Sequence, residues 1–432
     1  MVIRREFRPR VLPGWVQNSP RCPCSIQAMI RSKGRRLARS HRHPVPSAVV
    51  LAIALSACGA RSELEVLGSP NLPADASVQS GTHTQPCNGT WSFAPQVIYA
   101  TGNNPNAIAV GDFNRDGFDD LAIVNETEGT VGTSLNDGTG AFAPQVIYAC
   151  AAPVALAAGD FNRDGFVDLA VVNTAGTNTV GVLFNQKNGT FAPEVQYATG
   201  TYSSAVAVGD FNGDGAPDLA VVSQNDYAVS VHLNRGDGSF LARTTYRAGW
   251  ALAAIAVADF DADGSIDLAV ASGDNDVGIL LNKKDGTFWP NVTYAAGESP
   301  ESIAVGDWNG DGHVDLAVAD FLGSSVTVLQ NAGDGTFVPG GSYSSVANPR
   351  SVAAGDWNAD GHLDIAVANS VPNTVAAFVN DGGGNFGTQS TYATGTNPTF
   401  IAASDFNGDG HPDLAVANFG DNNVSILLAQ CQ

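Results

Sequence analysis

One eleven-residue pattern returns seven times along the chain at an almost constant spacing. It first appears as Asp112-Phe-Asn-Arg-Asp-Gly-Phe-Asp-Asp-Leu-Ala. Its later copies, 48 to 50 residues apart, begin at Asp160, Asp210, Asp259, Asp307, Asp356 and Asp405. A period of this length is typical of arrays and propellers, in which each repeat is one supersecondary unit. The chain is therefore expected to fold as seven similar units.

Each unit has the sequence of four short strands. Around Asp307 the predicted strands cover residues 303–306, 315–319, 325–331 and 342–346. They are short, β-branched and bounded by Gly, Asn and Asp, which favours strands. Segments such as Asn-Asp-Gly favour hairpins, because these residues accept positive φ. Only 15% of residues are charged, so the Glu, Lys and Arg of long surface helices are scarce. Four strands in seven units predict an all-β, seven-bladed β-propeller.

The two ends of the repeat region complement one another. Residues 87–100 match residues 136–149, so the region begins with the outer strand of a unit, and the seventh unit stops after the third strand at 424–428. The N-terminal strand should therefore complete the last blade and close the ring, which removes exposed edges. Cys87 and Cys431 fall at the same hairpin and predict a disulfide, with two unpaired thiols as the alternative. Cys150 has no evident mate and is expected to be a small, partly buried residue.

The chain begins with a predicted leader. Residues 48–57 are apolar and follow a basic run, which indicates a signal peptide. Leu55-Ser-Ala-Cys58 resembles the bacterial lipoprotein cleavage box, with Cys58 as the lipidated residue; an ordinary signal peptide is the alternative. Gly59 follows Cys58, where an Asp would be a retention signal, so the resemblance implies that the lipoprotein is located in the outer membrane. We expect a leader and lipoprotein signal peptide over 1–57, with 1–28 untranslated if Met29 is the start. A flexible tether over 58–90 and the propeller over 91–432 follow, with the protein secreted across the inner membrane and lipid-anchored at the outer membrane or cell surface.

Charge separates the leader from the rest of the chain. Residues 59–432 hold 10 basic and 41 acidic residues, a balance that repels phosphate backbones and excludes nucleic acid as a partner. Over half of these acids lie in the repeated loop Asp-x-Asn/Asp-x-Asp-Gly-x-x-Asp. Positions 1, 3, 5 and 9 supply side-chain oxygens and position 7 a backbone carbonyl, as in a shortened EF-hand loop. Oxygen ligands without His or Cys side chains favour Ca²⁺.

These loops resemble the FG-GAP/VCBS repeats of integrin α-chain propellers and of many secreted bacterial proteins. The resemblance covers about residues 91–432 and implies a propeller stabilised by up to seven Ca²⁺ ions. The ligands that it implies, with the carbonyl oxygen as donor at every seventh loop position, are Asp112, Asn114, Asp116, Phe118 and Asp120; Asp160, Asn162, Asp164, Phe166 and Asp168; Asp210, Asn212, Asp214, Ala216 and Asp218; Asp259, Asp261, Asp263, Ser265 and Asp267; Asp307, Asn309, Asp311, His313 and Asp315; Asp356, Asn358, Asp360, His362 and Asp364; and Asp405, Asn407, Asp409, His411 and Asp413.

Two departures within the repeats are predicted to affect packing or the surface rather than binding. Trp308 and Trp357 replace the usual Phe and should alter the packing between blades. The side chains of His313, His362 and His411 recur on successive blades, so we expect surface residues well apart from one another rather than a metal triad.

No hydrolase elbow, zinc-protease helix or phosphate loop is present in the sequence. The predicted function is a calcium-binding, surface-anchored, non-catalytic module for binding or adhesion to a protein or glycan. The expected monomer would touch the membrane through its lipid alone. Tyr202, Trp250 and Trp289 could stack on sugar rings, although core or rim packing explains them equally well. A structural role in the envelope is the alternative, followed by a propeller hydrolase or lyase.

Overall fold

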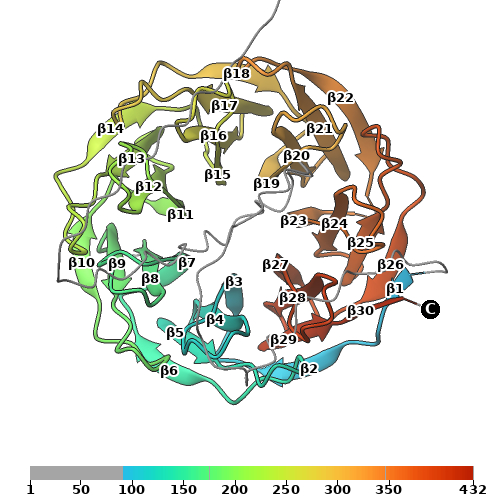
Figure 1. The fold of residues 1–432 in the computed structure, drawn as a ribbon, viewed down its shortest axis with the longest axis horizontal. Coiled ribbons are helices and arrows are strands. Elements are labelled where there is room, and N and C mark those ends of the chain that lie inside the picture. Colours follow the sequence, from blue (N-terminus) through green and yellow to red (C-terminus); the bar gives the residue numbers. More distant parts are fainter. Residues whose placement is uncertain (1–90, 175, 346, 432) are drawn as a thin grey trace, which may run out of the picture. The chain divides into compact units, whose positions relative to one another are not determined.

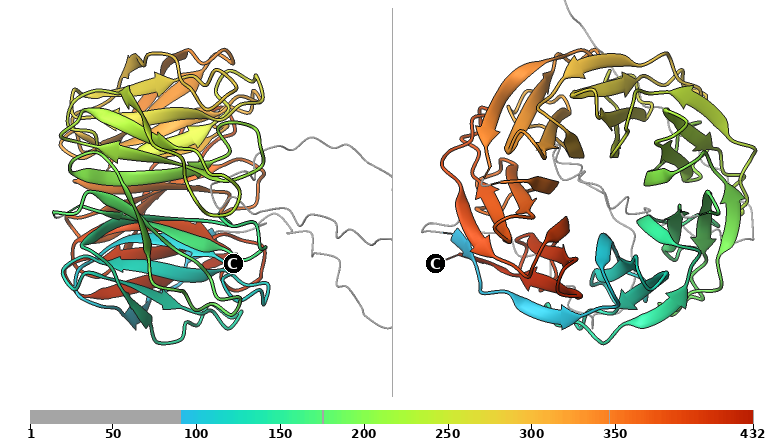
Figure 2. Two further views of the ribbon diagram at one scale, coloured as in Figure 1. Left: turned by 90° about the vertical axis from the view of Figure 1, so that its left-hand side faces the viewer. Right: turned by 180° about the vertical axis from the view of Figure 1, so that it is seen from behind.

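The computed structural model describes residues 91–174, 176–345 and 347–431, and these form seven four-stranded antiparallel sheets arranged around one axis (Figures 1 and 2). The predicted all-β, seven-bladed propeller is confirmed. Among the described residues there is no helix with the length and apolar character needed to cross a bilayer. The predicted leader, the tether, Cys58 and Cys87 lie outside the described residues.

The first strand of each blade lies nearest the axis and the second is fully buried. The first strands are β3 (Pro105–Gly111), β7 (Pro153–Gly159), β11 (Ser203–Gly209), β15 (Ile255–Ala258), β19 (Pro300–Gly306), β23 (Pro349–Gly355) and β27 (Pro398–Ser404). The second strands are β4 (Asp120–Asn125), β8 (Asp168–Asn173), β12 (Asp218–Ser223), β16 (Asp267–Ser272), β20 (Asp315–Asp320), β24 (Asp364–Asn369) and β28 (Asp413–Asn418). Blades are numbered 1 to 7 along the chain from β3.

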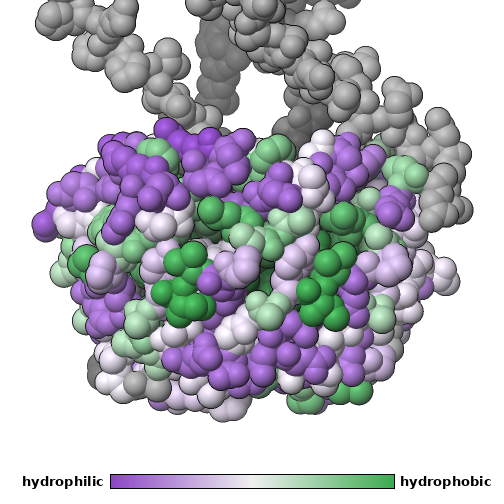
Figure 3. All heavy atoms as spheres, turned by 90° about the horizontal axis from the view of Figure 1, so that it is seen from below, coloured by the Kyte–Doolittle hydropathy of each residue, from purple (hydrophilic) through white to green (hydrophobic). Residues whose placement is uncertain are grey.

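The third strands are largely buried and the fourth form the rim. The third strands are β5 (Thr130–Ser134), β9 (Thr179–Leu183), β13 (Ala228–His232), β17 (Asp276–Leu280), β21 (Ser325–Asn331), β25 (Thr374–Phe378) and β29 (Asn423–Leu427). The fourth strands are β6 (Val146–Ala149), β10 (Val195–Ala198), β14 (Thr244–Arg247), β18 (Val292–Ala295), β22 (Phe337–Ser344), β26 (Ser390–Ala393) and, for blade 7, β2 (Val97–Ala100). Rim residues such as Val146 and Ile147 are about half exposed, and Figure 3 shows hydrophobic columns on the rim separated by hydrophilic surface.

The ring closes through the N-terminal strands, as the sequence predicts. Strand β2 pairs with β29, with Val97 opposite Ile426. Strand β1 (Trp91–Phe93) pairs with β30 (Ala429–Cys431), with Trp91 opposite Cys431. Cys431 is disulfide-bonded, and its pairing with Cys87 stays a prediction. Cys150 is a free, partly buried thiol, as expected, and burial raises its pKa to about 12.

Aromatic triads fill the junctions between blades. Phe113 of blade 1 meets Phe191 of blade 2 edge to face, and Tyr148 of blade 1 packs on the same ring at a centroid distance of 5.6 Å. The same triad recurs at the other six junctions. Trp308 and Trp357 take the place of Phe113 in blades 5 and 6 and are fully buried there. Their predicted effect on packing between blades is thus located at these junctions.

Antiparallel order assigns the loops to two faces. The aspartate loop between the first and second strands and the hairpin between the third and fourth strands lie on one face, here called the loop face. The turn between the second and third strands and the connector to the next blade lie on the other, here called the connector face.

Candidate metal centre

The backbone of each aspartate loop bends at two residues with positive φ. In blade 1 these are Arg115, with φ of 62°, and Gly117, with φ of 94°. The fourth loop position is Arg, Ala or Gly in different blades, but the sixth is Gly in all seven, because φ near 90° is strained for a residue with a Cβ. The bend lets oxygens two to eight residues apart in the loop approach one another.

Carboxylates and an amide oxygen hold the turn from inside. In blade 1 the two oxygens of Asp112 accept hydrogen bonds from the backbone N–H groups of Asp116 and Gly117 at 3.1 and 2.9 Å. Oδ1 of Asn114 accepts from Asp116 N–H at 2.8 Å, and Oδ1 of Asp116 accepts from Phe118 N–H at 3.0 Å. All seven loops repeat these four bonds. The sequence pattern therefore shapes the loop before any ion is considered.

The ninth loop residue is buried and has a structural role that the sequence pattern did not reveal. Asp120 is fully buried, and its oxygens accept from Phe113 N–H at 3.0 Å and from Asn136 N–H at 2.8 Å. It therefore joins the loop to the hairpin of the same blade. Burial raises the pKa of Asp120 to about 7, against the lowering effect of these two hydrogen bonds, and the carboxylates of Asp116 and Asp112 raise it further.

The same pKa shift recurs in every blade. Burial is the main cause, and it raises the pKa to about 7 for Asp120, Asp168, Asp218, Asp267, Asp315, Asp364 and Asp413. In blade 6 the buried Oδ2 of Asp364 has no hydrogen-bond partner among the described residues. A buried carboxylate with a raised pKa lacks compensating positive charge. Each loop therefore carries negative charge that a bound cation would compensate.

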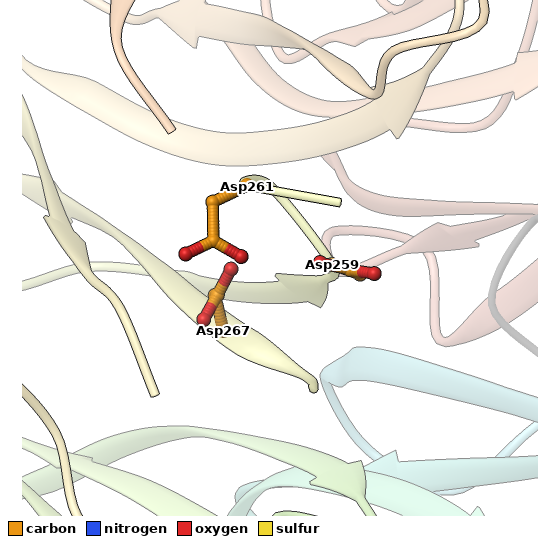
Figure 4. A group of neighbouring side chains, drawn as sticks. All are labelled: Asp259, Asp261 and Asp267. Atoms are coloured by element: carbon orange, nitrogen blue, oxygen red, sulfur yellow. The ribbon is translucent and has the colours of Figure 1, made fainter. Parts of the chain in front are cut away.

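The fourth loop brings three carboxylates closest together. Oxygens of Asp259, Asp261 and Asp267 lie within 4.8 Å of one another, and no other such acidic or His/Cys group occurs in residues 91–431 apart from the masked positions. Figure 4 shows the carboxylates of Asp261 and Asp267 facing one another, with Asp259 beside them. Asp263 is not part of the group. The other six loops have Asn at the third position, an amide oxygen in place of the extra carboxylate.

Basic side chains reach the fifth position of three loops. These ion pairs are Asp164 with Lys187 at 3.4 Å, Asp263 with Lys284 at 3.3 Å and Asp214 with Arg163 at 3.0 Å. All three basic side chains are substantially exposed, so the pairs are weak. They partly neutralise the fifth position but leave the buried ninth carboxylate without a contacting cation.

The seventh loop residues lie against their loops without forming a histidine cluster. Backbone N–H groups of His313 and His362 donate to Asp311 and Asp360 at 2.9 Å. Their rings lie over hairpin glycines of their own blades, and Nε2 of His411 is 3.5 Å from the Sγ of Cys431. The three side chains do not meet in the described part of the chain, as predicted. Whether the seventh carbonyls coordinate an ion stays a prediction.

A hairpin asparagine links adjacent blades, a role that the sequence pattern did not indicate. Asn282 of blade 4 donates from Nδ2 to the carbonyls of Phe211 in blade 3 and Ile266 at 2.8 and 2.9 Å, and it is not among the positive-φ residues. The same bond to the preceding blade is made by Asn136, Asn185, Asn234, Asn331 and Asn380. Blade 7 has Ala429 at this position, where β1 pairs with β30.

The donor set fits a hard divalent cation. Each loop holds at least three carboxylates and one side-chain amide or further carboxylate, and no His or Cys side chain occupies a ligand position. Ca²⁺ accepts six to eight such oxygens in flexible geometry. Metals that prefer nitrogen or sulfur find no suitable ligands in these loops.

Solved structures share this architecture at low sequence identity. A chain of the complex of BBS1N with ARL6DN is 14% identical, with a TM-score of 0.56, and the match covers 79% of this chain and 97% of that one. A chain of the mitotic checkpoint complex is 16% identical, with a TM-score of 0.53, covering 83% and 98%. The inactive virginiamycin B lyase of Staphylococcus aureus is 13% identical, with a TM-score of 0.52, covering 78% and 99%. These likenesses show the fold alone. The search of curated proteins finds no match.

The family model for the FG-GAP-like repeat matches seven overlapping segments, at residues 82–123, 112–171, 168–221, 210–270, 259–318, 307–367 and 356–416. The matches run across the whole ring and include every aspartate loop. Together with the repeated loop geometry, they establish that this chain belongs to the FG-GAP-like repeat family.

Proposed function

We propose that the chain is a calcium-binding, surface-anchored propeller that acts as a non-catalytic module for binding or adhesion to a protein or glycan. The observation that carries the calcium part is the buried ninth carboxylate of each loop, whose pKa is raised to about 7. Seven such groups in one domain are costly when ionised and uncompensated. A divalent ion in each loop would remove that cost.

The residues that would hold the ion are the first, third, fifth and ninth of each loop, with the seventh carbonyl. In blade 4 these side chains are Asp259, Asp261, Asp263 and Asp267. When bound, the ion supplies positive charge that compensates the carboxylates. The hydrogen bonds within the loop keep the first, third and fifth oxygens directed into the turn, so little ordering would accompany binding.

The binding role is supported by surface aromatic side chains and by the nature of the repeats. Tyr202, Trp250 and Trp289 are each more than half exposed, which favours the surface over the core among the alternatives that the sequence leaves open. Among the structural neighbours, BBS1N is in a complex with ARL6DN and another chain is part of the mitotic checkpoint complex. These neighbours make a protein partner reasonable for a propeller. The catalytic alternative finds no support in the aspartate loops, where the carboxylates are assigned to the ion.

Calcium stoichiometry tests the first part. Equilibrium dialysis of residues 59–432, which keep Cys87, should give up to seven bound ions, and the double variant Asp307→Ala, Asp311→Ala should lose one of them. Both residues are on the loop surface, so the buried Asp315 stays in place. Asp334→Ala is the matched control, because Asp334 is an exposed acid of the same blade that bonds only within its hairpin. Unchanged stoichiometry in the double variant would refute the ligand assignment.

The binding role requires a separate experiment. A glycan array and a pull-down from envelope extracts, each with and without calcium, should give saturable binding to one class of ligand. Absence of binding in both assays, with calcium stoichiometry intact, would favour the structural role in the envelope.

A further inference from the structure

A hollow of about 540 Å³ opens over blade 4. Its lining includes Gln224, Trp250, Asn275, Glu298, Glu301 and Leu322. All but one of these residues belong to connectors between blades or to turns between second and third strands, and Glu301 is the second residue of β19, so the hollow is on the connector face. It is remote from the aspartate loops, which occupy the opposite face. Its volume is within the range of small-molecule sites.

The hollow arises from a local departure in blade 4. Its first strand, β15, has four residues, whereas the first strands of the other six blades have seven. The connector ahead of β15 carries small side chains, with Ala251 and Ala253 in the lining. The backbone ahead of β15 still bonds to β16, through Ala253 N–H to the Ala271 carbonyl at 3.1 Å and Ala271 N–H to the Ala254 carbonyl at 3.0 Å, so the space comes from the small side chains rather than from a missing piece of strand.

Trp250 stands in this hollow on a fixed backbone. Its carbonyl accepts hydrogen bonds from Gly273 N–H at 2.9 Å and from the Ser272 hydroxyl at 3.1 Å, while its side chain is 56% exposed. Gly273 is needed for this approach, because a Cβ there would lie 2.7 Å from the Ala251 Cβ and 3.5 Å from Cε3 of the indole. The backbone that carries the ring is thus held in position and the ring is exposed, so no backbone ordering is needed for binding.

The hollow is acidic. Glu298 is exposed and Glu301 is partly buried, and neither takes part in any of the three ion pairs found among the described residues. Burial raises the pKa of Glu301 and the charge of Arg350 lowers it, while the Arg350 guanidinium lies over the Phe321 ring at 4.4 Å. The site therefore presents two carboxylates beside an aromatic face and an uncharged amide.

Another exposed indole of the chain already has an ammonium group against its ring. Trp289 is 57% exposed, and the ammonium of Lys283 lies 4.5 Å from its ring centroid. No basic side chain lies over the ring of Trp250 among the described residues. An ammonium is attracted to the face of an indole, and the nearby carboxylates of Glu298 and Glu301 strengthen that attraction.

We propose that the Trp250 hollow binds an organic ammonium group, either a protonated primary amine or a quaternary ammonium. This inference deepens the proposed binding role and rests on it. The indole face provides the cation–π contact, the two glutamates provide the opposite charge, and Leu322 borders the site with an apolar surface. The ammonium would take the place at Trp250 that Lys283 has at Trp289.

Saturation-transfer NMR with choline tests the proposal on the calcium-loaded protein. Choline should bind saturably, and 3,3-dimethylbutan-1-ol, its uncharged isostere, should bind at least about tenfold more weakly. Trp250→Ala should weaken choline binding by roughly tenfold. Glu298→Gln should weaken choline binding and leave the isostere unchanged. Asp334→Asn is the control, because it removes the charge of an exposed acid on the loop face, and it should bind choline as the wild type does.

Several outcomes would overturn the proposal. They are absence of saturable choline binding, equal binding of the isostere, and full choline binding by both Trp250→Ala and Glu298→Gln. Binding of N-acetylglucosamine in place of choline would assign the hollow to a sugar instead. Calcium stoichiometry is measured on the same samples. If it is intact while choline does not bind, the ammonium assignment fails and the proposed function does not.

Discussion

Removing calcium is expected to reverse the direction in which the protein's stability changes with pH. In the stripped protein the ninth loop carboxylates have pKa values of about 7 instead of the usual 3.8. Between these two values the folded state holds protons that the unfolded state has released. The free energy of unfolding therefore falls as the pH rises through this window. In the loaded protein the ion needs ionised ligands, so acidification displaces it and lowers stability.

The size of the effect follows from the number of carboxylates. Between pH 6 and pH 8, each carboxyl group with a pKa near 7 loses its proton in the folded state, which lowers the free energy of unfolding by at most about 1.4 kcal/mol. Seven groups give an upper limit of about 10 kcal/mol, and relaxation around partly solvated loops reduces this to roughly 5 kcal/mol. His232 opposes the effect, because burial lowers its pKa to about 4. Its contribution over the same range is about 0.8 kcal/mol.

The corresponding shift in melting temperature is measurable. An unfolding entropy of about 2.1 cal/mol/K per residue over roughly 340 residues gives about 0.7 kcal/mol per degree. The stripped protein should therefore melt about 6 to 7 °C lower at pH 8 than at pH 6. With millimolar calcium present, the melting temperature should instead rise over the same range.

Differential scanning calorimetry at pH 6, 7 and 8 makes the comparison. Calcium is best removed on a chelating resin, because the affinity of soluble chelators itself depends on pH. Parallel pH dependence in the stripped and loaded samples, or a stripped sample that melts higher at pH 8 than at pH 6, would refute the argument that the buried carboxylates lack compensating charge.

Other substitutions test separate parts of the structure. His232→Leu should raise stability by about 1 to 2 kcal/mol, since the buried Nε2 has no hydrogen-bond partner among the described residues; a lower urea midpoint would contradict this. Asn282→Ala should lower the free energy of unfolding by about 3 kcal/mol, because two carbonyls and two N–H groups lose their partner. An unfolding free energy within about 0.5 kcal/mol of wild type would show that the link between blades is dispensable. Cys58→Ser should release the protein from the membrane fraction, and unaltered partitioning would argue against lipidation. Non-reducing peptide mapping should recover Cys87 joined to Cys431, and free thiols at both positions would exclude that bond.

The repeat period and the offset ends of the repeat region were enough to predict the ring and its closure. Both depend on local strand patterns that recur in register, and the pairing of Val97 with Ile426 follows once the missing strand is identified. The shape of the loops was predictable in the same way, because a turn with a fixed Gly directs nearby oxygens to one side; that these oxygens bind Ca²⁺ stays a prediction.

Contacts between blades were harder to predict. The role of Asn282 depends on the Phe211 carbonyl, 71 residues earlier, and no local pattern indicates that contact. The buried function of Asp120 was also hidden, because its partner Asn136 belongs to a different loop. The Trp250 hollow was hidden too, because its lining comes from segments as far apart as Gln224 and Leu322.

Ring closure has a consequence for the order in which the molecule can assemble. Gln96 and Ser425 are hydrogen-bonded across a separation of 329 residues. Strand β2, which is synthesised early, therefore cannot pair until β29 has been synthesised. Blades 1 to 6 can each form from contiguous sequence, but blade 7 cannot. A nascent chain emerging from a ribosome or a translocation channel therefore remains an incomplete circle, with an unpaired edge, until its final blade has been delivered.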